Sequence, residues 1–210
     1  MKIDKNRLSP MMQKYLETKE NYPDAVLFYR LGDFYEMFFE DAILCSRLLE
    51  LTLTGKDCGL EERAPMCGVP HHAAKQYIAK LVENGYKVAI CEQLTAPGDQ
   101  KGLVERGVVQ IVTPGTVLES DALDSSTNNF LMYIHTEGNC VGVCYSDIST
   151  GLMEMTEICS NDYIKLLDDI IIRVRPKEIL CNEETITICG KLTTVNTSYV
   201  PEFSVYNGVH

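Results

Sequence analysis

The sequence predicts a mixed α/β (α+β) chain of two units, and three observations point to this fold class. Short apolar runs with β character alternate with amphipathic helical segments between residues 25 and 115. After residue 129 the pattern changes to three short strands in succession, then a helix and a fourth strand. Residues 117–128 between them are acidic, rich in serine and prone to turns, as a linker is. We therefore expect one domain over residues 1–116 and another over residues 129–210.

The first domain is expected to be a mixed sheet flanked by helices. Ser9 is a preferred N-cap residue and Pro10 suits the first helical position, so a helix is predicted from there to about Lys19. An apolar strand follows over residues 25–30, and the acids Glu40-Asp41 favour a helix start. The remaining predicted elements are a β-like run over 51–54, a rigid proline-bounded crossing over 64–72, a helix over 72–84, and strands over 87–91 and 108–112.

The stretch from Phe28 to Phe39 organises this domain, because it holds four of the six phenylalanines. Gly32-Asp33 interrupts it, and glycine tolerates positive φ while aspartate favours turns, so the following residues should lie on a tip or an edge. Phe34 then stands two residues before Glu36, at the start of an amphipathic segment. An aromatic residue there is either part of the core beside a solvated acid or a side chain exposed for binding. The pattern leaves both interpretations open.

The second domain begins with strands over 130–134, 141–145 and 152–155, a helix over 161–173 and a strand over 176–181. This β-β-β-α-β order is the start of an RNase H-like sheet. From Glu183 to His210 the pattern weakens, and no closing helix is predicted. We therefore expect a C-terminally truncated, partial domain from a longer protein.

The net charge of −11 is unevenly distributed. Residues 1–115 hold 14 Lys and Arg against 16 Asp and Glu, whereas residues 116–210 hold 5 against 14. The first domain can therefore carry a local basic face, but the second is a poor candidate for a phosphate-binding surface.

The cysteines and the apolar runs indicate the cellular compartment. None of the nine cysteines forms a Cys-x-x-Cys pair, and several lie inside apolar runs. They are predicted to be small buried hydrophobic residues in a reducing cytosol, and neither a disulfide framework nor a zinc site. No signal peptide is recognisable, and no run approaches the roughly 18 apolar residues of a membrane span. We expect a cytoplasmic protein with no membrane partner.

The sequence offers no set of residues suited to catalysis or to metal binding. No P-loop pattern occurs, and the adjacent His71-His72 cannot face one metal from a regular helix. Asp33, Glu36 and Asp147 could serve a metal-dependent nuclease, but neither region has the three or so convergent carboxylates of such sites. A nuclease and a protein-interaction adaptor are kept as alternatives.

The run RLGDFYEMF over residues 30–38 closely resembles the mismatch-recognition motif of the MutS family of bacterial DNA mismatch repair proteins. Four further blocks resemble the family in the same order, over residues 10–16, 65–73, 88–93 and 111–116. The second half is similar to the family's connector domain in strand order and in residues 146–151. The resemblance implies a fragment made of the mismatch-recognition domain and part of the connector.

Carried onto this chain, the family's Phe-x-Glu motif falls on Phe34 and Glu36. The resemblance implies that Phe34 enters the minor groove as a wedge at mismatched or unpaired bases, which initiates DNA mismatch repair. Glu36 would weaken binding to intact duplex and contact a displaced base.

The remaining expectations concern supporting residues and partners. Met66 is expected to pack behind Phe34. Phosphate contacts are expected from Lys56, Arg63, Lys75, Lys101 and Arg106. Related proteins often carry basic residues near the last strand, where this chain has Gly107 and Gln110. The fragment itself is expected neither to be an enzyme nor to hold a cofactor. ATP with Mg²⁺, homodimer formation, MutL, the sliding clamp and association with the nucleoid are implied only for the full-length protein.

Overall fold

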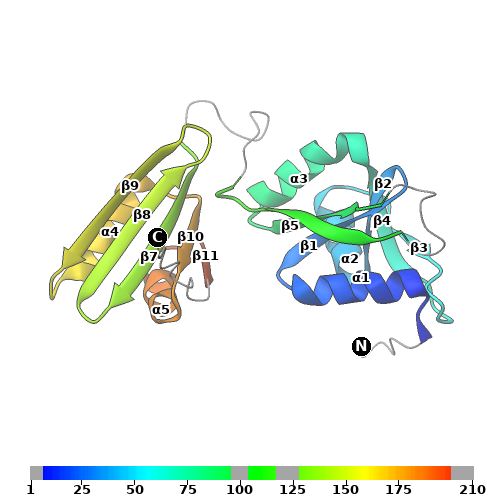
Figure 1. Ribbon diagram of the computed structural model, residues 1–210, viewed down its shortest axis with the longest axis horizontal. Helices are drawn as coiled ribbons and strands as arrows, with labels where there is room; N and C mark the ends of the chain where they lie inside the picture. The colour runs from blue at the N-terminus through cyan, green and yellow to red at the C-terminus, as the bar shows by residue number, and fades with distance from the viewer. Residues whose placement is uncertain (1–6, 96–103, 117–127, 200–210) are drawn as a thin grey trace, which may run out of the picture. The chain divides into compact units, whose positions relative to one another are not determined.

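The computed structural model describes residues 7–95, 104–116 and 128–199. The chain divides into two compact units, residues 1–113 and 114–210, each with its own sheet (Figure 1). The predicted mixed α+β class is confirmed. The predicted linker lies outside the described residues except for Asn128. None of the helices in the described ranges is long and apolar enough to cross a membrane.

The first unit is built on a six-stranded mixed sheet in the order β3-β4-β2-β1-β5-β6. The pairing of β1 with β5 is parallel, and the other pairings are antiparallel. The strands are β1 (Ala25–Leu31), β2 (Phe34–Phe38), β3 (Thr54–Lys56), β4 (Ala64–Pro70), β5 (Lys87–Gln93) and β6 (Arg106–Val112).

Helices cover both faces of this sheet. The helical elements are α1 (Pro10–Asn21), α2 (Phe39–Leu48), a short 3-10 helix (His71–Ala73) and α3 (Ala74–Glu83). Figure 1 shows α1 and α3 on opposite sides of the sheet. Met12 and Tyr15 of α1 are buried in one cluster with Tyr29 and Phe38. The apolar side of the first helix is therefore buried against the sheet in this cluster.

The second unit has a five-stranded sheet in the order β11-β10-β7-β8-β9. Its strands are β7 (Phe130–Glu137), β8 (Cys140–Asp147), β9 (Leu152–Cys159), β10 (Glu178–Cys181) and β11 (Asn196–Tyr199). The first three form an antiparallel meander, and β10 pairs in parallel with β7. This is the strand order predicted for an RNase H-like sheet.

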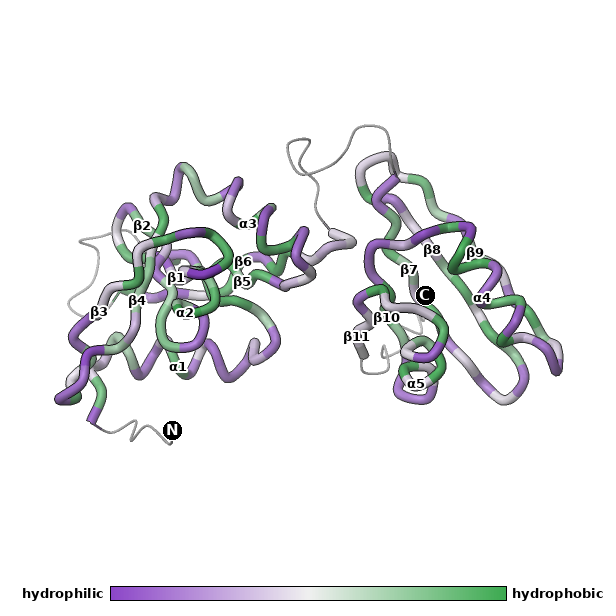
Figure 2. The backbone as a smooth tube through the Cα atoms, turned by 180° about the vertical axis from the view of Figure 1, so that it is seen from behind, coloured by the Kyte–Doolittle hydropathy of each residue, from purple (hydrophilic) through white to green (hydrophobic). Residues whose placement is uncertain are grey.

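Two helices, α4 (Tyr163–Val174) and α5 (Glu183–Leu192), complete this unit. Hydrophobic and hydrophilic residues alternate along α4 (Figure 2), and its apolar side includes the buried Leu167 and Ile171. They share a core with Met132 and Ile134 of β7, so α4 packs on one face of the sheet. Burial of this helix face stabilises the unit by the hydrophobic effect.

The sequence predicted neither β2 nor β4 as a strand. The stretch after Phe34 continues as β2 and becomes helical only at Phe39, whose φ is 53°. The segment with Pro65 and Pro70 is a strand although proline cannot donate a backbone hydrogen bond, because both prolines lie near its ends. The run over 51–54 forms a strand only from Thr54.

In the second unit no helix was predicted after Glu183, and this prediction is wrong, because α5 and β11 lie there. The expectation of no disulfide is also wrong. Cys140 and Cys159 are direct partners in the β8–β9 register and form a disulfide bond. Spacing along the chain could not reveal this pairing. Six other cysteines are buried as predicted, namely Cys45, Cys58, Cys67, Cys91, Cys181 and Cys189.

Candidate functional site

A two-residue turn joins β1 to β2 and sets the position of Phe34. Leu31 pairs with Phe34 across the hairpin, and Gly32 at the first turn position has a φ of +59°. Glycine at that position is typical of a type II′ hairpin turn, whose twist matches the flanking strands. The backbone N–H of His71 donates to the carbonyl of Asp33 at 2.9 Å. This bond fastens the turn to the end of β4.

Phe34 is the exposed aromatic side chain of the organising stretch. Its exposed fraction is 46%, whereas Phe28, Tyr29 and Phe38 are buried. The structure therefore places Phe34 outside the core, which excludes the interpretation of Phe34 as a core residue. Single exposed apolar residues are common on protein surfaces, so the feature that distinguishes Phe34 is the position of its ring at a turn that neighbouring contacts hold in place.

The alternation of β2 explains why Phe34 is uncovered. Phe34, Glu36 and Phe38 lie on one face of the strand, since successive side chains point to opposite faces. Helix α1 covers the far end of that face, where the rings of Tyr15 and Phe38 meet with centroids 4.9 Å apart. The turn end, with Phe34, lies beyond this contact.

Glu36 is paired with Lys56, one of the predicted phosphate contacts. The Lys56 ammonium forms an ion pair with Glu36 Oε2 and lies 5.6 Å from the centre of the Phe38 ring. Gly68 lies opposite Glu36 on β4, and a Cβ added there would be 3.5 Å from Glu36 Cγ. Glu36 is thus neither a free carboxylate nor a fully exposed one.

The opposite face of the hairpin carries a second polar cluster. Tyr35 donates its hydroxyl hydrogen to the Glu92 carboxylate, and the Arg30 guanidinium lies 3.8 Å from that carboxylate and 5.5 Å from the Tyr35 ring. Burial, followed by the hydrogen bond to Glu92, raises the pKa of Tyr35 to about 12. Arg30 Nε also donates to the Gly32 carbonyl in the turn. These contacts brace the turn from behind.

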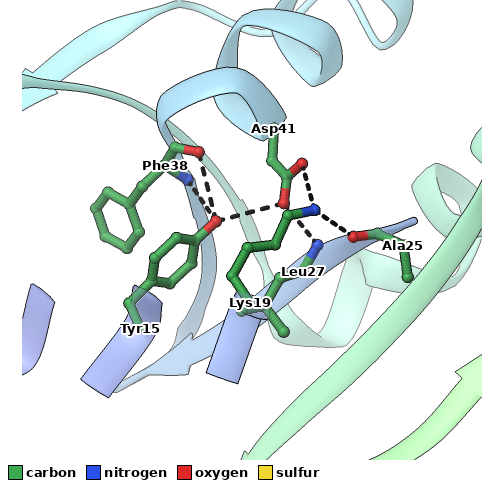
Figure 3. Close-up of polar contacts among 6 residues, drawn as sticks. All are labelled: Tyr15, Lys19, Ala25, Leu27, Phe38 and Asp41. Carbon is green, nitrogen blue, oxygen red and sulfur yellow. Dashed lines mark hydrogen bonds and ion pairs between the residues drawn. The ribbon is translucent and has the colours of Figure 1, made fainter. Parts of the chain in front are cut away.

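A third network joins α1, β1 and the start of α2 (Figure 3). Asp41 accepts from Lys19 Nζ and from the backbone N–H of Leu27, both at 2.9 Å. The Tyr15 hydroxyl lies 3.4 Å from Asp41 Oδ2 and accepts from the Phe38 backbone N–H at 3.3 Å. Burial and then the Asp41 charge raise the pKa of Tyr15 well above its usual value. The network holds the inner end of β2.

The other predicted supporting residues are dispersed. Arg106 donates to the backbone carbonyls of Arg30 at 2.8 Å and Val104 at 3.0 Å, so it joins β6 to β1. Met66 lies opposite Phe38, and the residue opposite Phe34 is Pro70. Met66 therefore packs against the core cluster rather than directly behind Phe34.

Of the remaining predicted phosphate contacts, two lie on exposed positions and one cannot be placed. Arg63 precedes β4 and Lys75 lies on α3. Lys101 lies outside the described residues. Sequence reasoning missed Tyr35, Glu92 and Lys19 as supporting groups. The one available signal concerned Glu92, which is an acid at the end of an apolar strand.

Two of the three carboxylates considered for a nuclease, Glu36 and Asp147, are engaged in other contacts. Glu36 is paired with Lys56, whereas Asp147, in the other unit, accepts from the Ser149 hydroxyl at 2.6 Å and from the Asn129 backbone N–H at 3.2 Å. The Ser149 hydrogen bond is the main cause that lowers the pKa of Asp147. Within the described ranges, no group of three or more His, Cys, Asp or Glu side chains could hold a metal ion.

Comparison with known proteins identifies relatives of both units. The family model described as MutS domain I matches residues 9–121, and that described as MutS domain II matches residues 129–197. The DNA mismatch repair protein MutS of Clostridioides difficile is 51% identical over 203 residues, which are 96% of this chain and 21% of the relative. That of Acetivibrio thermocellus is 58% identical over 178 residues, 84% of this chain and 20% of the relative. The chain thus spans about a fifth of the length of these curated relatives.

Proposed function

The chain belongs to the MutS family, and from this premise we propose that its first unit recognises mismatched or unpaired bases in duplex DNA by inserting Phe34 from the minor groove. The observation that carries the proposal is the exposed ring of Phe34 on a braced turn, beside the buried rings of Tyr29, Tyr35 and Phe38. An apolar wedge must be both accessible and rigidly mounted.

Recognition by a wedge depends on how easily the duplex deforms. Inserting a ring between base pairs unstacks a step and kinks the helix, which costs roughly a few kcal/mol in ordinary duplex. At a mispair or an unpaired base the stack is already weak, so the same kink costs less. Stacking of the ring on a base returns about 1–3 kcal/mol, by comparison with single-strand binders. Discrimination then comes from deformability and needs no sequence readout.

Glu36 contributes to this discrimination through its negative charge. It lies on the same face of β2 as Phe34, two residues from the ring. A carboxylate near phosphates disfavours any duplex, and it recovers that loss only by a hydrogen bond to the edge of a displaced base. A matched duplex offers no such edge.

The rest of the activity belongs to the whole protein. We propose that the second unit, whose sequence is strongly acidic, connects the first unit to the rest of the full-length protein and does not contact DNA. Initiation of mismatch repair, ATP and Mg²⁺ binding, homodimer formation, and contacts with MutL or a sliding clamp are proposals for the full-length protein. The two described units supply no catalytic step in this proposal.

The proposal is tested by DNA affinity. The Kd of the chain is measured by fluorescence anisotropy for a duplex with a G·T pair or a one-base loop and for the matched duplex. Phe34→Ala should remove most of the preference for the mismatch. Leu53→Ala is the control, because Leu53 is an apolar residue of nearly equal exposure, 47%, outside the hairpin. It should leave the preference unchanged.

Two results would contradict the proposal. One is an unchanged ratio of the two Kd values in Phe34→Ala. The other is the appearance of cleaved DNA when Mg²⁺ is added, which would favour the nuclease alternative.

A further inference from the structure

We propose that Lys56 is a specificity-determining residue that holds Glu36 in the free protein and passes to a DNA phosphate when a duplex engages. The inference rests on the proposed function of the Phe34 face and names a regulation of that same face. It starts from a contact that links two strands which are not neighbours. Lys56 lies on β3 and Glu36 on β2, with β4 between them.

The contact crosses β4 diagonally. Lys56 pairs with Ala64 and Glu36 pairs with Gly68, and Met66 lies between these two positions on the same face of β4. The Lys56 side chain therefore extends toward the turn past Met66 and Phe38, and its ammonium lies 5.6 Å from the centre of the Phe38 ring. Gly68 leaves room beside Glu36, because a Cβ there would lie 3.5 Å from Glu36 Cγ. Only the ammonium at the tip of the long Lys56 side chain reaches the carboxylate.

Lys56 is more exposed than Glu36, and an exchange of the ammonium from the carboxylate to a phosphate requires this difference. The Lys56 side chain is 32% exposed and the Glu36 side chain 16%. A phosphate can therefore approach the ammonium, while the carboxylate is less exposed. Partly exposed ion pairs are held weakly, and a lysine–phosphate contact releases condensed counterions from DNA. The ammonium can change partners without a large barrier.

The exchange would couple DNA binding to discrimination. When Lys56 moves to a phosphate, Glu36 loses its counter-ion beside the groove. In a matched duplex no displaced base offers this charge a donor, and the broken pair remains a cost. At a mispair a displaced base can donate a hydrogen bond to Glu36 and offset that cost. Breaking the Lys56–Glu36 pair thus offsets the gain from the phosphate contact in every duplex, and only a mispair restores that loss.

A double-mutant cycle on matched duplex tests this exchange. Lys56→Met, Glu36→Gln and the double variant are compared in the 210-residue chain at low salt. With Glu36 present, Lys56→Met should change the Kd by less than about twofold, because the lost phosphate contact is offset by the pair that no longer has to break. In the Glu36→Gln background, the same change should weaken binding about fivefold. The slope of log affinity against log salt should fall by about 1 in that background.

Lys87→Met is the matched control, because Lys87 forms a 2.8 Å ion pair with Asp24 at the end of β1 remote from the turn. Its effect should not depend on whether Glu36 is present or replaced. Lys56→Arg keeps the charge and should behave like the unsubstituted chain. Thermal unfolding of each variant shows whether the sheet is intact.

Three outcomes would overturn the inference. Equal effects of Lys56→Met in both backgrounds would make Lys56 an independent phosphate contact. A larger loss with Glu36 present would mean that Lys56 stays on Glu36 as a shield. If the unsubstituted chain binds no duplex at all, Lys56 neither exchanges between Glu36 and a phosphate nor contacts a phosphate independently. The proposed wedge is judged separately, because Phe34→Ala is scored on the mismatch-to-matched ratio and this cycle on matched duplex alone.

Discussion

Tyr35 on β2 donates a hydrogen bond to Glu92 on β5, and these two strands are separated by β1. Arg30 on the intervening strand lies within 3.8 Å of the same carboxylate. The three side chains therefore span the middle of the sheet on the face opposite Phe34. These contacts tie β2 to β5 across β1, and they support the hairpin on which the proposed wedge is mounted.

Removal of the Tyr35 hydroxyl should lower stability in a way that depends on pH. Tyr35→Phe should cost about 1–3 kcal/mol at neutral pH, because the Glu92 carboxylate loses a buried donor. The pKa of Tyr35 is raised from 10.0 to about 12, so the protonated form is favoured by folding. This stability is complete below pH 10 and is lost as the pH rises from 10 to 12.

The measurement is the free energy of unfolding in urea for both proteins across that pH range. The difference between them should shrink above pH 10. A difference that grows with pH would show that the hydroxyl is ionised in the fold.

Replacement of Gly32 in the turn should show whether an effect on mismatch preference is separate from an effect on stability. Gly32→Ala should cost about 1 kcal/mol, because alanine is strained at the φ of +59° found there. Gly138→Ala is its match in the second unit, with a φ of +61° and likewise no atom within 4 Å of an added Cβ. Both variants should lose similar stability, but only Gly32→Ala should reduce the preference for mismatched duplex. Equal preferences would mean that the turn does not position Phe34.

Loss of the buried carboxylate at the start of α2 should be more costly than loss of an exposed one. Asp41→Asn should destabilise the first unit by about 2–4 kcal/mol, because Lys19 is left without its counter-ion in a partly buried site. Asp24→Asn breaks the pair between Lys87 and the mostly exposed Asp24 carboxylate, and it should cost less than about 1 kcal/mol. Urea denaturation of both variants checks the order, and similar losses would contradict it.

The disulfide of the second unit can be tested by counting the thiols that react with an alkylating reagent. Alkylation after denaturation without reductant should label seven of the nine cysteines, since Cys140 and Cys159 are bonded. In Cys159→Ser all eight remaining thiols should react. That variant should lose about 3 kcal/mol of stability, because the bond closes a loop with a sequence separation of 19 residues. Labelling of all nine thiols in the unsubstituted chain would show that the bond is absent.

The sequence predicted the elements whose apolar periodicity is local. The first helix, the strands β1, β5 and β7–β10, and the helices α3 and α4 are all present near their predicted positions. The strands β2 and β4 were missed because a helix-like acidic segment follows one and prolines bound the other. In both, pairing with neighbouring strands overrides local propensity.

The candidate site was predictable in part. Gly32-Asp33 correctly indicated a turn, and the resemblance singled out Phe34 and Glu36. The sequence could not show whether Phe34 was buried, because that depends on how far α1 extends over the sheet. It also could not show that Lys56, taken as a phosphate contact, is the partner of Glu36.

The sequence by itself determined the family, the two-unit organisation and the turn before Phe34, because each is carried by local runs of residues. Only the tertiary structure decided which charges meet. Lys56 and Glu36 are 20 residues apart, and Tyr35 and Glu92 are 57 apart. Strand order and register bring these pairs together, and apolar periodicity encodes neither.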